Sequence, residues 1–439
     1  MRKLILILSV VLLTGGENLF AQQDSIWTLE KCIKYALDKN IQVRKGELSN
    51  QEFVLNAYQA RMQRMMSVNA SVNQNFNWAR STSTGSSSLT GSNGSNYSVS
   101  AGVTLFNASK LTNLISQAEL AIDGGKYSLE TTKESISLSI LNAYLQILYA
   151  GEQVNNSEKQ IESSKSQLNL ANERLITQLI STSDYAQVKS QLASEELTLA
   201  NSKSLLAIDK INLMQLMELP VADSFNIAHP DLSGSLDQGR IPDVKTVYEK
   251  ALEIKPQVKN AAINKQIAAI DEKIAKSGYY PTLSASAGIG SGYSNLTADN
   301  YFGQINNGIK PYAGLSLSIP IYQKNQVKTN VEIAIIGYQT ADLSEMDTRN
   351  QLRKSIEQAC QDVISAQIQY EASLENYKAM QETSALSNEK FTNGMINSTD
   401  YLVSKTNLIV AESQLLQSKF NLIFSYKILD FYSGVPLAL

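Results

Sequence analysis

The sequence contains very little histidine and cysteine, two residue types that many catalytic and metal sites use. Its 439 residues include one histidine and two cysteines, and no phosphate-binding glycine loop, nucleophile elbow or metal-ligand spacing occurs. The histidine, His229, precedes a proline and has no cysteine or histidine near it, which favours a loop histidine over a metal ligand. We therefore expect no enzyme activity, no cofactor and no metal.

Long apolar runs and an excess of one charge are also missing. Beyond the first 21 residues, no segment supplies the roughly 18 uninterrupted apolar residues that indicate a transmembrane helix. The net charge of -3, with both signs interspersed, disfavours a nucleic-acid partner. Cys32 and Cys360 are too few for a disulfide scaffold. Two free buried thiols are favoured, but a Cys32–Cys360 disulfide stays open because the sequence gives no distance.

The first residues have the pattern of a secretory signal peptide. Arg2 and Lys3 precede an apolar stretch from Leu4 to Leu13, and the small residue Ala21 precedes polar residues. A basic start, a short apolar region and a small residue at the cleavage site are typical of export signals. Residues 1–21 are therefore predicted to be a signal peptide.

The remaining chain is an internal repeat with an offset of 215 to 216 residues. Matching segments include Ala36-Leu37-Asp38 with Ala251-Leu252-Glu253, Asp184-Tyr185 with Asp400-Tyr401, and Leu219-Pro220 with Val435-Pro436. A register kept over this length indicates a duplicated architecture. We predict a first repeat over 22–220, a linker over 221–243 and a second repeat over 244–439.

Each repeat contains a predicted β-hairpin, over about 67–107 and about 281–322. Apolar and polar residues alternate with a period of two, as in a strand with one polar face. In the first hairpin we expect a solvated loop over 81–96, and in the second we expect Ile319 and Ile321 to continue the last strand. Strands of about ten residues with one apolar face are long enough to cross a bilayer when tilted.

A very long helix is predicted after each hairpin, over about 108–176 and 324–392, because almost no proline interrupts these segments. Each would reach roughly 100 Å, which requires a helical assembly. Heptad spacing supports this. The predicted seam residues are Leu352, Ile356, Ala359, Val363, Ala366, Tyr370, Ser373 and Tyr377, with Ile136, Ile140, Ala143, Ile147, Ala150, Val154, Ser157 and Ile161 in the first copy.

Each long helix is expected to turn and return, which gives helical hairpins over about 108–219 and 323–433. Candidate N-caps of the return helices are Ser181, Ser183, Ser398 and Thr399. An open four-stranded sheet cannot remain in lipid, because its edge groups would lack hydrogen-bond partners. Several chains must therefore contribute strands to one shared barrel.

The paired hairpin segments Glu173–Tyr185 and Glu389–Tyr401 carry a family resemblance. With the duplicated order of helix, two strands, long helix and hairpin, the chain resembles outer-membrane efflux proteins of the TolC family over nearly its whole length. The second segment fits the family pattern, whereas Leu175 replaces an aromatic and Gln178 a glycine in the first. These departures leave the conformation of the first tip open.

The resemblance implies an α+β membrane protein in the outer membrane of a Gram-negative bacterium, extending into the periplasm. Four transmembrane strands per chain would form a twelve-stranded β-barrel in a homotrimer surrounded by outer-membrane lipid, continuous with a long periplasmic α-helical barrel. The implied partners are a periplasmic adaptor protein and an inner-membrane pump of RND or ABC type.

Candidate site residues lie at the two hairpin tips. Asp184 and Asp400 are either acids that favourably meet a helix dipole or members of an acidic ring at the entrance. Glu173, Arg174, Glu389 and Lys390 are either a solvated face or bridges across a closed tip. Adaptor docking and simple hairpin packing are the alternatives for Leu179, Ile180, Ser181, Gly394, Met395, Ile396 and Asn397.

The function predicted from these observations is a passive exit duct for small molecules such as drugs or metals. Type I protein secretion is the alternative within the same class, since both processes use such a duct. A trimeric coiled-coil adhesin is a weaker alternative, because a fibre needs no amphipathic strands between its helices. A periplasmic adaptor is also disfavoured, because adaptors pair one helical hairpin with β-rich domains.

Overall fold

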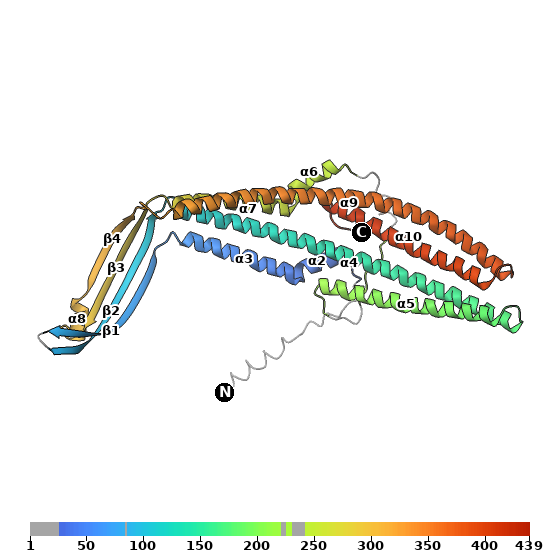
Figure 1. The fold of residues 1–439 in the computed structure, drawn as a ribbon, viewed down its shortest axis with the longest axis horizontal. Coiled ribbons are helices and arrows are strands. Elements are labelled where there is room, and N and C mark those ends of the chain that lie inside the picture. Colours follow the sequence, from blue (N-terminus) through green and yellow to red (C-terminus); the bar gives the residue numbers. More distant parts are fainter. Residues whose placement is uncertain (1–25, 84–85, 221–224, 231–241) are drawn as a thin grey trace, which may run out of the picture. The chain divides into compact units, whose positions relative to one another are not determined.

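The structure, a computed structural model, describes residues 26–83, 86–220, 225–230 and 242–439 (Figure 1). The predicted signal peptide and much of the predicted linker lie outside these residues. The first series of elements is α2 (Leu29–Lys39), α3 (Ile41–Met62), β1 (Ser67–Ser83), β2 (Ser86–Phe106), α4 (Lys110–Ile176) and α5 (Thr182–Leu216). The second is α6 (Val244–Ile254), α7 (Pro256–Ser277), β3 (Thr282–Ser294), α8 (Tyr301–Asn307), β4 (Lys310–Ser318), α9 (Gln326–Thr392) and α10 (Ser398–Tyr432).

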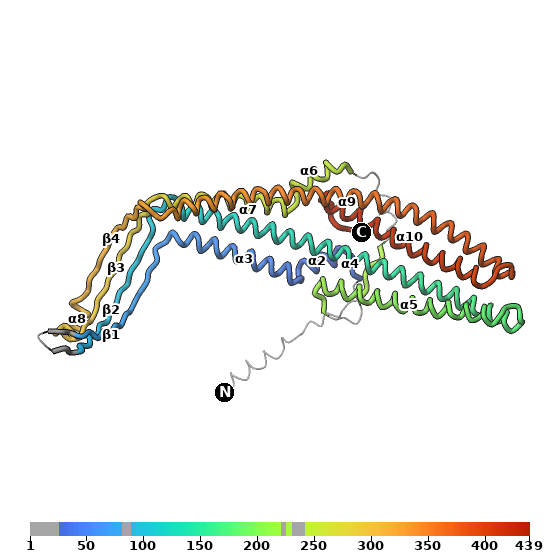
Figure 2. The backbone as a smooth tube through the Cα atoms, in the orientation of Figure 1, coloured from blue at the N-terminus to red at the C-terminus, as the bar shows by residue number. Residues whose placement is uncertain are grey.

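The element boundaries repeat with the offset seen in the sequence. Helices α2 and α3 match α6 and α7 at 215 residues, and α4 and α5 match α9 and α10 at 216. Both long helices have 67 residues and both return helices have 35. The tube drawing shows the two helical hairpins, α4 with α5 and α9 with α10, as two copies of one motif (Figure 2).

The chain divides into two compact units. The first unit comprises Met1–Ile41, Glu134–Val247 and Ile356–Leu439, and the second comprises Gln42–Lys133 and Tyr248–Ser355. The second unit contains the sheet, and the first contains both return helices. Helices α4 and α9 each contribute to both units.

The sheet of the second unit is antiparallel, with strand order β1-β2-β3-β4. Directly paired residues share a face, and the ladder aligns Val68 with Ala101, Ala101 with Ala287, and Ala287 with Ala313. One face is therefore apolar across all four strands. Polar residues align on the other face, as Ser71 and Ser98 do with hydroxyl oxygens 2.7 Å apart. The alternation predicted from the sequence is confirmed.

The strand lengths differ from the prediction. Strands β1 and β2 have 17 and 21 residues, so the loop expected over 81–96 was wrong. Main-chain pairing continues there despite the Ser, Asn and Gly side chains, because ladder hydrogen bonds do not depend on side-chain type. Strand β4 ends at Ser318, and Ile319 and Ile321 lie outside it. Pro320 explains this end, since it has no N–H to donate to a ladder.

The heptad seam lies inside the helical packing. Ile140, Ile356 and Val363 have 0% exposed surface, and the other seam residues are buried or half-buried. A helix break lies at Lys255-Pro256, because α6 ends at Ile254 and Pro256 is the first residue of α7. No helix in the described part of the chain has the length and apolar character needed to cross a membrane.

The main core lies in the first unit around Tyr144. The Tyr144 hydroxyl lies 3.1 Å from the carbonyl oxygen of Trp27 and 2.8 Å from that of Ala228. At the same place, Trp27 and Ile227 form a parallel β-bridge. This hydroxyl therefore ties the start of the first repeat to the segment between the repeats.

Both cysteines are buried free thiols. Burial raises the pKa of Cys32 to about 12, which leaves its thiol protonated and unreactive. Cys360 lies 216 positions after Tyr144, so it occupies the place of that tyrosine in the second repeat. The Cys32–Cys360 disulfide that the sequence left open is not formed in this structure.

Candidate functional site: the helical hairpin tips

The two tips have the same backbone geometry. Two residues after the end of each long helix, the backbone has a positive φ, which is 59° at Gln178 and 72° at Gly394. In the first tip the N–H of Leu179 donates to the carbonyl of Arg174 at 2.8 Å, and in the second the N–H of Met395 donates to that of Lys390 at 2.8 Å. This pattern is a Schellman cap. The conformation that the sequence left open at Gln178 is therefore the same as that at Gly394.

The return helices start with different caps. Ser181 caps α5, and Asp184 completes a capping box by accepting from the Ser181 backbone N–H. Asn397 caps α10, where its side chain accepts from the N–H of Asp400 at 2.8 Å. Ser181 was predicted as a cap, whereas the prediction of Ser183, Ser398 or Thr399 was wrong. An asparagine satisfies this position as well as a serine does, and it frees Ser398 for another contact.

Ser398 and Asp184 join the two tips. The Ser398 hydroxyl oxygen lies 2.5 Å from Asp184 Oδ1 and 2.8 Å from Gln187 Oε1. Hydrogen bonds from Ser398 and then from Ser181 lower the pKa of Asp184, because they stabilise its ionised form. Asp184 is thus a bridging acceptor between the hairpins, whereas its counterpart Asp400 is exposed.

Arg174 forms a second link between the tips. Its guanidinium donates to the carbonyl of Phe391 at 3.0 Å and to that of Thr392. It also lies 5.6 Å from the centre of the Phe391 ring. A cation at the C-terminal end of α9 favourably meets that helix dipole. Arg174 therefore binds carbonyl oxygens of the neighbouring tip, and Glu173, Glu389 and Lys390 are exposed.

The second tip contains an aromatic stack that the first tip lacks. The rings of Phe391 and Tyr401 are 4.8 Å apart with an interplanar angle of 13°, and both side chains are buried. Burial raises the pKa of Tyr401 to about 12. In the first tip the corresponding Leu175 and Tyr185 are only half-buried, so the loss of the aromatic at 175 removes this stack.

Two apolar side chains stand out at matched positions of the tips. Leu179 is 74% exposed and Met395 is 72% exposed. Ile180 and Ile396 are half-buried, and the remaining predicted docking residues Ser181, Gly394 and Asn397 are exposed. The arrangement presents two equivalent apolar groups on firmly capped turns, which suits the binding of a partner protein.

The sequence matches a known family in both repeats. The model of the outer membrane efflux protein family covers residues 32–218 and 247–434. The chain belongs to the outer membrane efflux protein family. This assignment confirms the TolC-family resemblance and the predicted localisation in the outer membrane with an extension into the periplasm. No protein of curated function matched the sequence.

Solved outer-membrane channels have the same fold. CusC superposes with a TM-score of 0.78 and 16% identity, over 93% of this chain and 92% of that chain. VceC from Vibrio cholerae gives 0.76 and 15%, over 93% and 96%. The open state of MtrE from Neisseria gonorrhoeae gives 0.75 and 15%, over 93% and 89%. At these identities, the similarity establishes the fold.

A buried ionic cluster of this efflux protein was not predicted from the sequence. Lys405 on α10 lies 3.0 Å from Glu195 on α5, and these side chains are 5% and 7% exposed. The hydroxyl of Ser164 on α4 hydrogen-bonds to both. Ala411 occupies the position of Glu195 in the second repeat. Comparing the repeats was the available signal, since Lys189 matches Lys405 while the acid at 195 has no acidic counterpart at 411.

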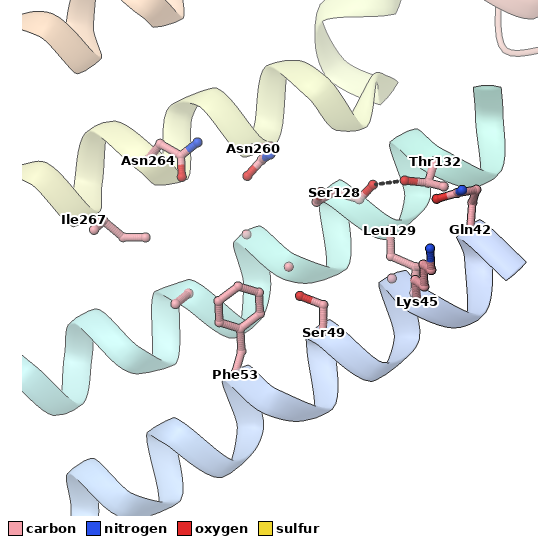
Figure 3. A pocket seen from close by; sticks show the side chains of 14 residues that line it. Gln42, Lys45, Ser49, Phe53, Ser128, Leu129, Thr132, Asn260, Asn264 and Ile267 are labelled. Carbon is pink, nitrogen blue, oxygen red and sulfur yellow. Dashed lines mark hydrogen bonds between the residues drawn. The ribbon is translucent and has the colours of Figure 1, made fainter.

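A cavity of about 530 Å³ in the second unit lies among α3, α4 and α7 (Figure 3). Its lining contains amides, hydroxyls and Lys45, with no acid, histidine or cysteine. Gly125 in this lining allows close helix packing, because a Cβ there would lie 2.6 Å from the Phe53 ring. The cavity therefore offers no acid–base pair. Across the described residues, no group of three His, Cys, Asp or Glu side chains is placed to hold a metal.

Proposed function

We propose that this outer membrane efflux protein is the exit duct of a tripartite efflux system and works as a homotrimer with a periplasmic adaptor and an inner-membrane pump. The observation that carries the proposal is the sheet, which has an apolar face across all strands and two outer edges, β1 and β4, that pair with no further strand among the described residues. In a lipid environment these edges need partners. Pairing β4 of one copy with β1 of the next satisfies both, and three copies give twelve strands.

Two rows of exposed apolar residues, here called the α3 seam and the α9 seam, support the same assembly. On α3, Leu48, Leu55 and Met62 follow one another at heptad spacing and are 63%, 67% and 38% exposed. On α9, Ile333, Ile336 and Leu343 are 60% to 64% exposed. Strand β1 directly follows α3, and β4 directly precedes α9. The strand pairing that closes the barrel therefore also brings the α9 seam of one copy to the α3 seam of the next.

A charge placed in this seam tests the assembly. Leu55→Lys puts an ammonium group into the proposed interface and is expected to shift the purified protein from trimer to monomer in native mass measurements. The matched control is Asn56→Lys, since Asn56 is the exposed neighbour on α3 outside the seam. A Leu55→Lys protein that stays as trimeric as the control contradicts the proposed interface.

The hairpin tips provide the proposed docking and gating surface. Leu179 and Met395 are the apolar contacts for the adaptor, with Ile180, Ser181, Gly394, Ile396 and Asn397 completing the two turns. Asp184 and Asp400, three copies of each in a trimer, surround the entrance as an acidic ring that attracts cations. The Arg174 and Ser398 links hold the two hairpins of one chain together.

The cargo is the remaining part of the proposal. In this proposal the duct conducts small molecules such as drugs or metals passively, and the pump and adaptor supply most of the selectivity. Deleting the gene is expected to increase sensitivity to toxic small molecules while leaving the secreted proteins unchanged. Loss of a secreted protein without a change in sensitivity would favour type I secretion instead.

A further inference from the structure

The second repeat contains a short helix that the first repeat lacks. In the first repeat, β1 ends at Ser83 and β2 begins at Ser86. In the second repeat, β3 ends at Ser294 and β4 begins at Lys310, and this longer connection contains α8. Figure 1 shows α8 beside the sheet, at the end where these strands are connected. This end is opposite to the one from which α9 begins. The difference breaks the repeat at one specific place.

Helix α8 is fixed to β3 by a set of hydrogen bonds. Gln304 Oε1 accepts from the N–H of Ser294 at 2.9 Å, and its Nε2 donates to the Ser294 carbonyl at 3.0 Å and to the Asp299 carbonyl at 2.7 Å. The Ser291 hydroxyl donates to the carbonyl of Ile305 at 2.6 Å. These contacts give the connection a defined conformation.

The ends of α8 are specified as well. The side chain of Asn300 caps the helix by accepting from the N–H of Gly303 at 2.6 Å. At the other end, a Cβ on Gly308 would lie 2.5 Å from the carbonyl oxygen of Gln304, so the chain can close the helix only with glycine there. A loop that merely joins two strands does not need this degree of specification.

The apolar face of the sheet is the face that α8 covers. The Tyr301 hydroxyl lies 2.7 Å from that of Tyr97, and its ring is 5.0 Å from the ring of Tyr293. Tyr97 pairs with Ser291, two residues beyond the pair Val99 and Ile289. Since residues two apart on a strand share a face, the tyrosines extend the apolar face toward its outer end.

Helix α8 and its flank expose large apolar groups next to this face. Phe302 is 81% exposed and Leu296 is 70% exposed. On this face the medium beyond the sheet is lipid, if the sheet crosses the outer membrane as the family assignment indicates. Aromatic side chains are favoured where a membrane barrel meets the headgroups. A helix held flat at that level buries its apolar groups among the first acyl-chain segments.

We propose that α8 is an interfacial membrane anchor, with Phe302 and Leu296 inserted at the boundary between headgroups and acyl chains of the outer leaflet. This inference rests on the proposed function only because it requires the sheet to span the membrane. The anchor occurs once per chain, so a trimer carries three of them around its outer rim. They fix the height and the tilt of the barrel against the membrane surface.

Spin-label accessibility in lipid vesicles tests this inference on the full protein. A single nitroxide is placed at Phe302→Cys, at Leu315→Cys on the apolar face of β4 and at Ser316→Cys on its polar face. A fourth label at Asp299→Cys is the matched control, since Asp299 is exposed in the same connection. The native cysteines are buried, and the unsubstituted protein serves as the labelling blank.

The expected result is a shift of the label at 302 toward the value at 315, with high accessibility to oxygen and low accessibility to a water-soluble nickel chelate. A label at 302 that behaves like those at 299 and 316 overturns the anchor. Low accessibility to both reagents also overturns it, because that result means burial against protein. If the label at 315 itself reports water, the proposed membrane-spanning sheet fails and not only the anchor.

Discussion

The buried pair of Glu195 and Lys405 makes a strong prediction about stability. Replacing Glu195 by Ala, the residue that the second repeat has at this position, leaves an ammonium group that is 5% exposed without its carboxylate partner. Removing one partner of such a buried pair costs about 3–5 kcal/mol. At about 2–4 °C per kcal/mol for a unit of this size, the thermal midpoint is expected to fall by roughly 6–20 °C.

The double variant separates lost charge balance from lost packing. In Glu195→Ala with Lys405→Met no unpaired charge remains, and replacing a buried ion pair by apolar groups is often neutral or stabilising. The double variant is therefore expected to recover most of the loss. A matched control is Glu375→Ala in the exposed pair of Lys378 and Glu375, which are 2.7 Å apart. This change is expected to cost about 0–1 kcal/mol.

Thermal unfolding of the purified protein in detergent, followed by circular dichroism, measures all four proteins. A Glu195→Ala midpoint within the range of the Glu375→Ala control would refute the argument that the pair is isolated from water. A double variant as unstable as Glu195→Ala would refute the argument that the unpaired charge causes the loss. In that case Lys405 would stabilise the structure mainly through its aliphatic packing.

Two further predictions concern the tips. The left-handed conformation of Gln178 costs a non-glycine residue about 1–2 kcal/mol. Gln178→Gly is therefore expected to raise the thermal midpoint, and Gly394→Gln is expected to lower it. Midpoints equal to that of the wild type would contradict this backbone strain. Ser398→Ala is expected to destabilise the protein at pH 7, because Asp184 loses its largest stabilising hydrogen bond. The folded pKa of Asp184 is depressed, so this stabilisation is present above the ordinary value of 3.8 and is lost as the pH falls through the lower folded value. The difference between Ser398→Ala and wild type in thermal midpoint should therefore shrink below about pH 4, and a difference that grows in acid would contradict the role of Asp184 as acceptor.

Periodicity in the sequence was sufficient to predict the long elements. The near absence of proline predicted both long helices to within two residues of their observed starts, and the heptad spacing from Ile136 predicted their buried side. The alternation around Val68 gave the apolar face of the sheet. These patterns are repeated over many residues, so single exceptions do not mislead.

Local chemistry was less informative. Residues 86–96 look like a loop because of their Ser, Asn and Gly content, yet they pair with β1 through the main chain. Asn397 and Ser398 are both good caps, and only the structure shows that Ser398 instead contacts Asp184. Helix α8 has seven residues, which is too short for a periodic signal.

The contacts between the hairpins could not be predicted from the sequence for a different reason. Glu195 and Lys405 are far apart in the chain and come from different repeats, so no spacing connects them. Arg174 was expected either to lie on a solvated face or to bridge a closed tip, and the structure shows its guanidinium donating to carbonyl oxygens at the end of α9. Side-chain partners of this kind depend on how the helices are rotated against each other.

The central claim, a duct that docks an adaptor at its tips, is tested most directly by photo-crosslinking in living cells from position 395. Met395 is 72% exposed at the tip, and Glu382, exposed on the side of α9, provides the control position. The account predicts that the probe at 395, and not the probe at 382, captures a periplasmic protein with one helical hairpin and β-rich domains, and that Leu179→Asp with Met395 intact weakens this capture. Equal capture at both positions, or capture of surface proteins alone, would contradict it.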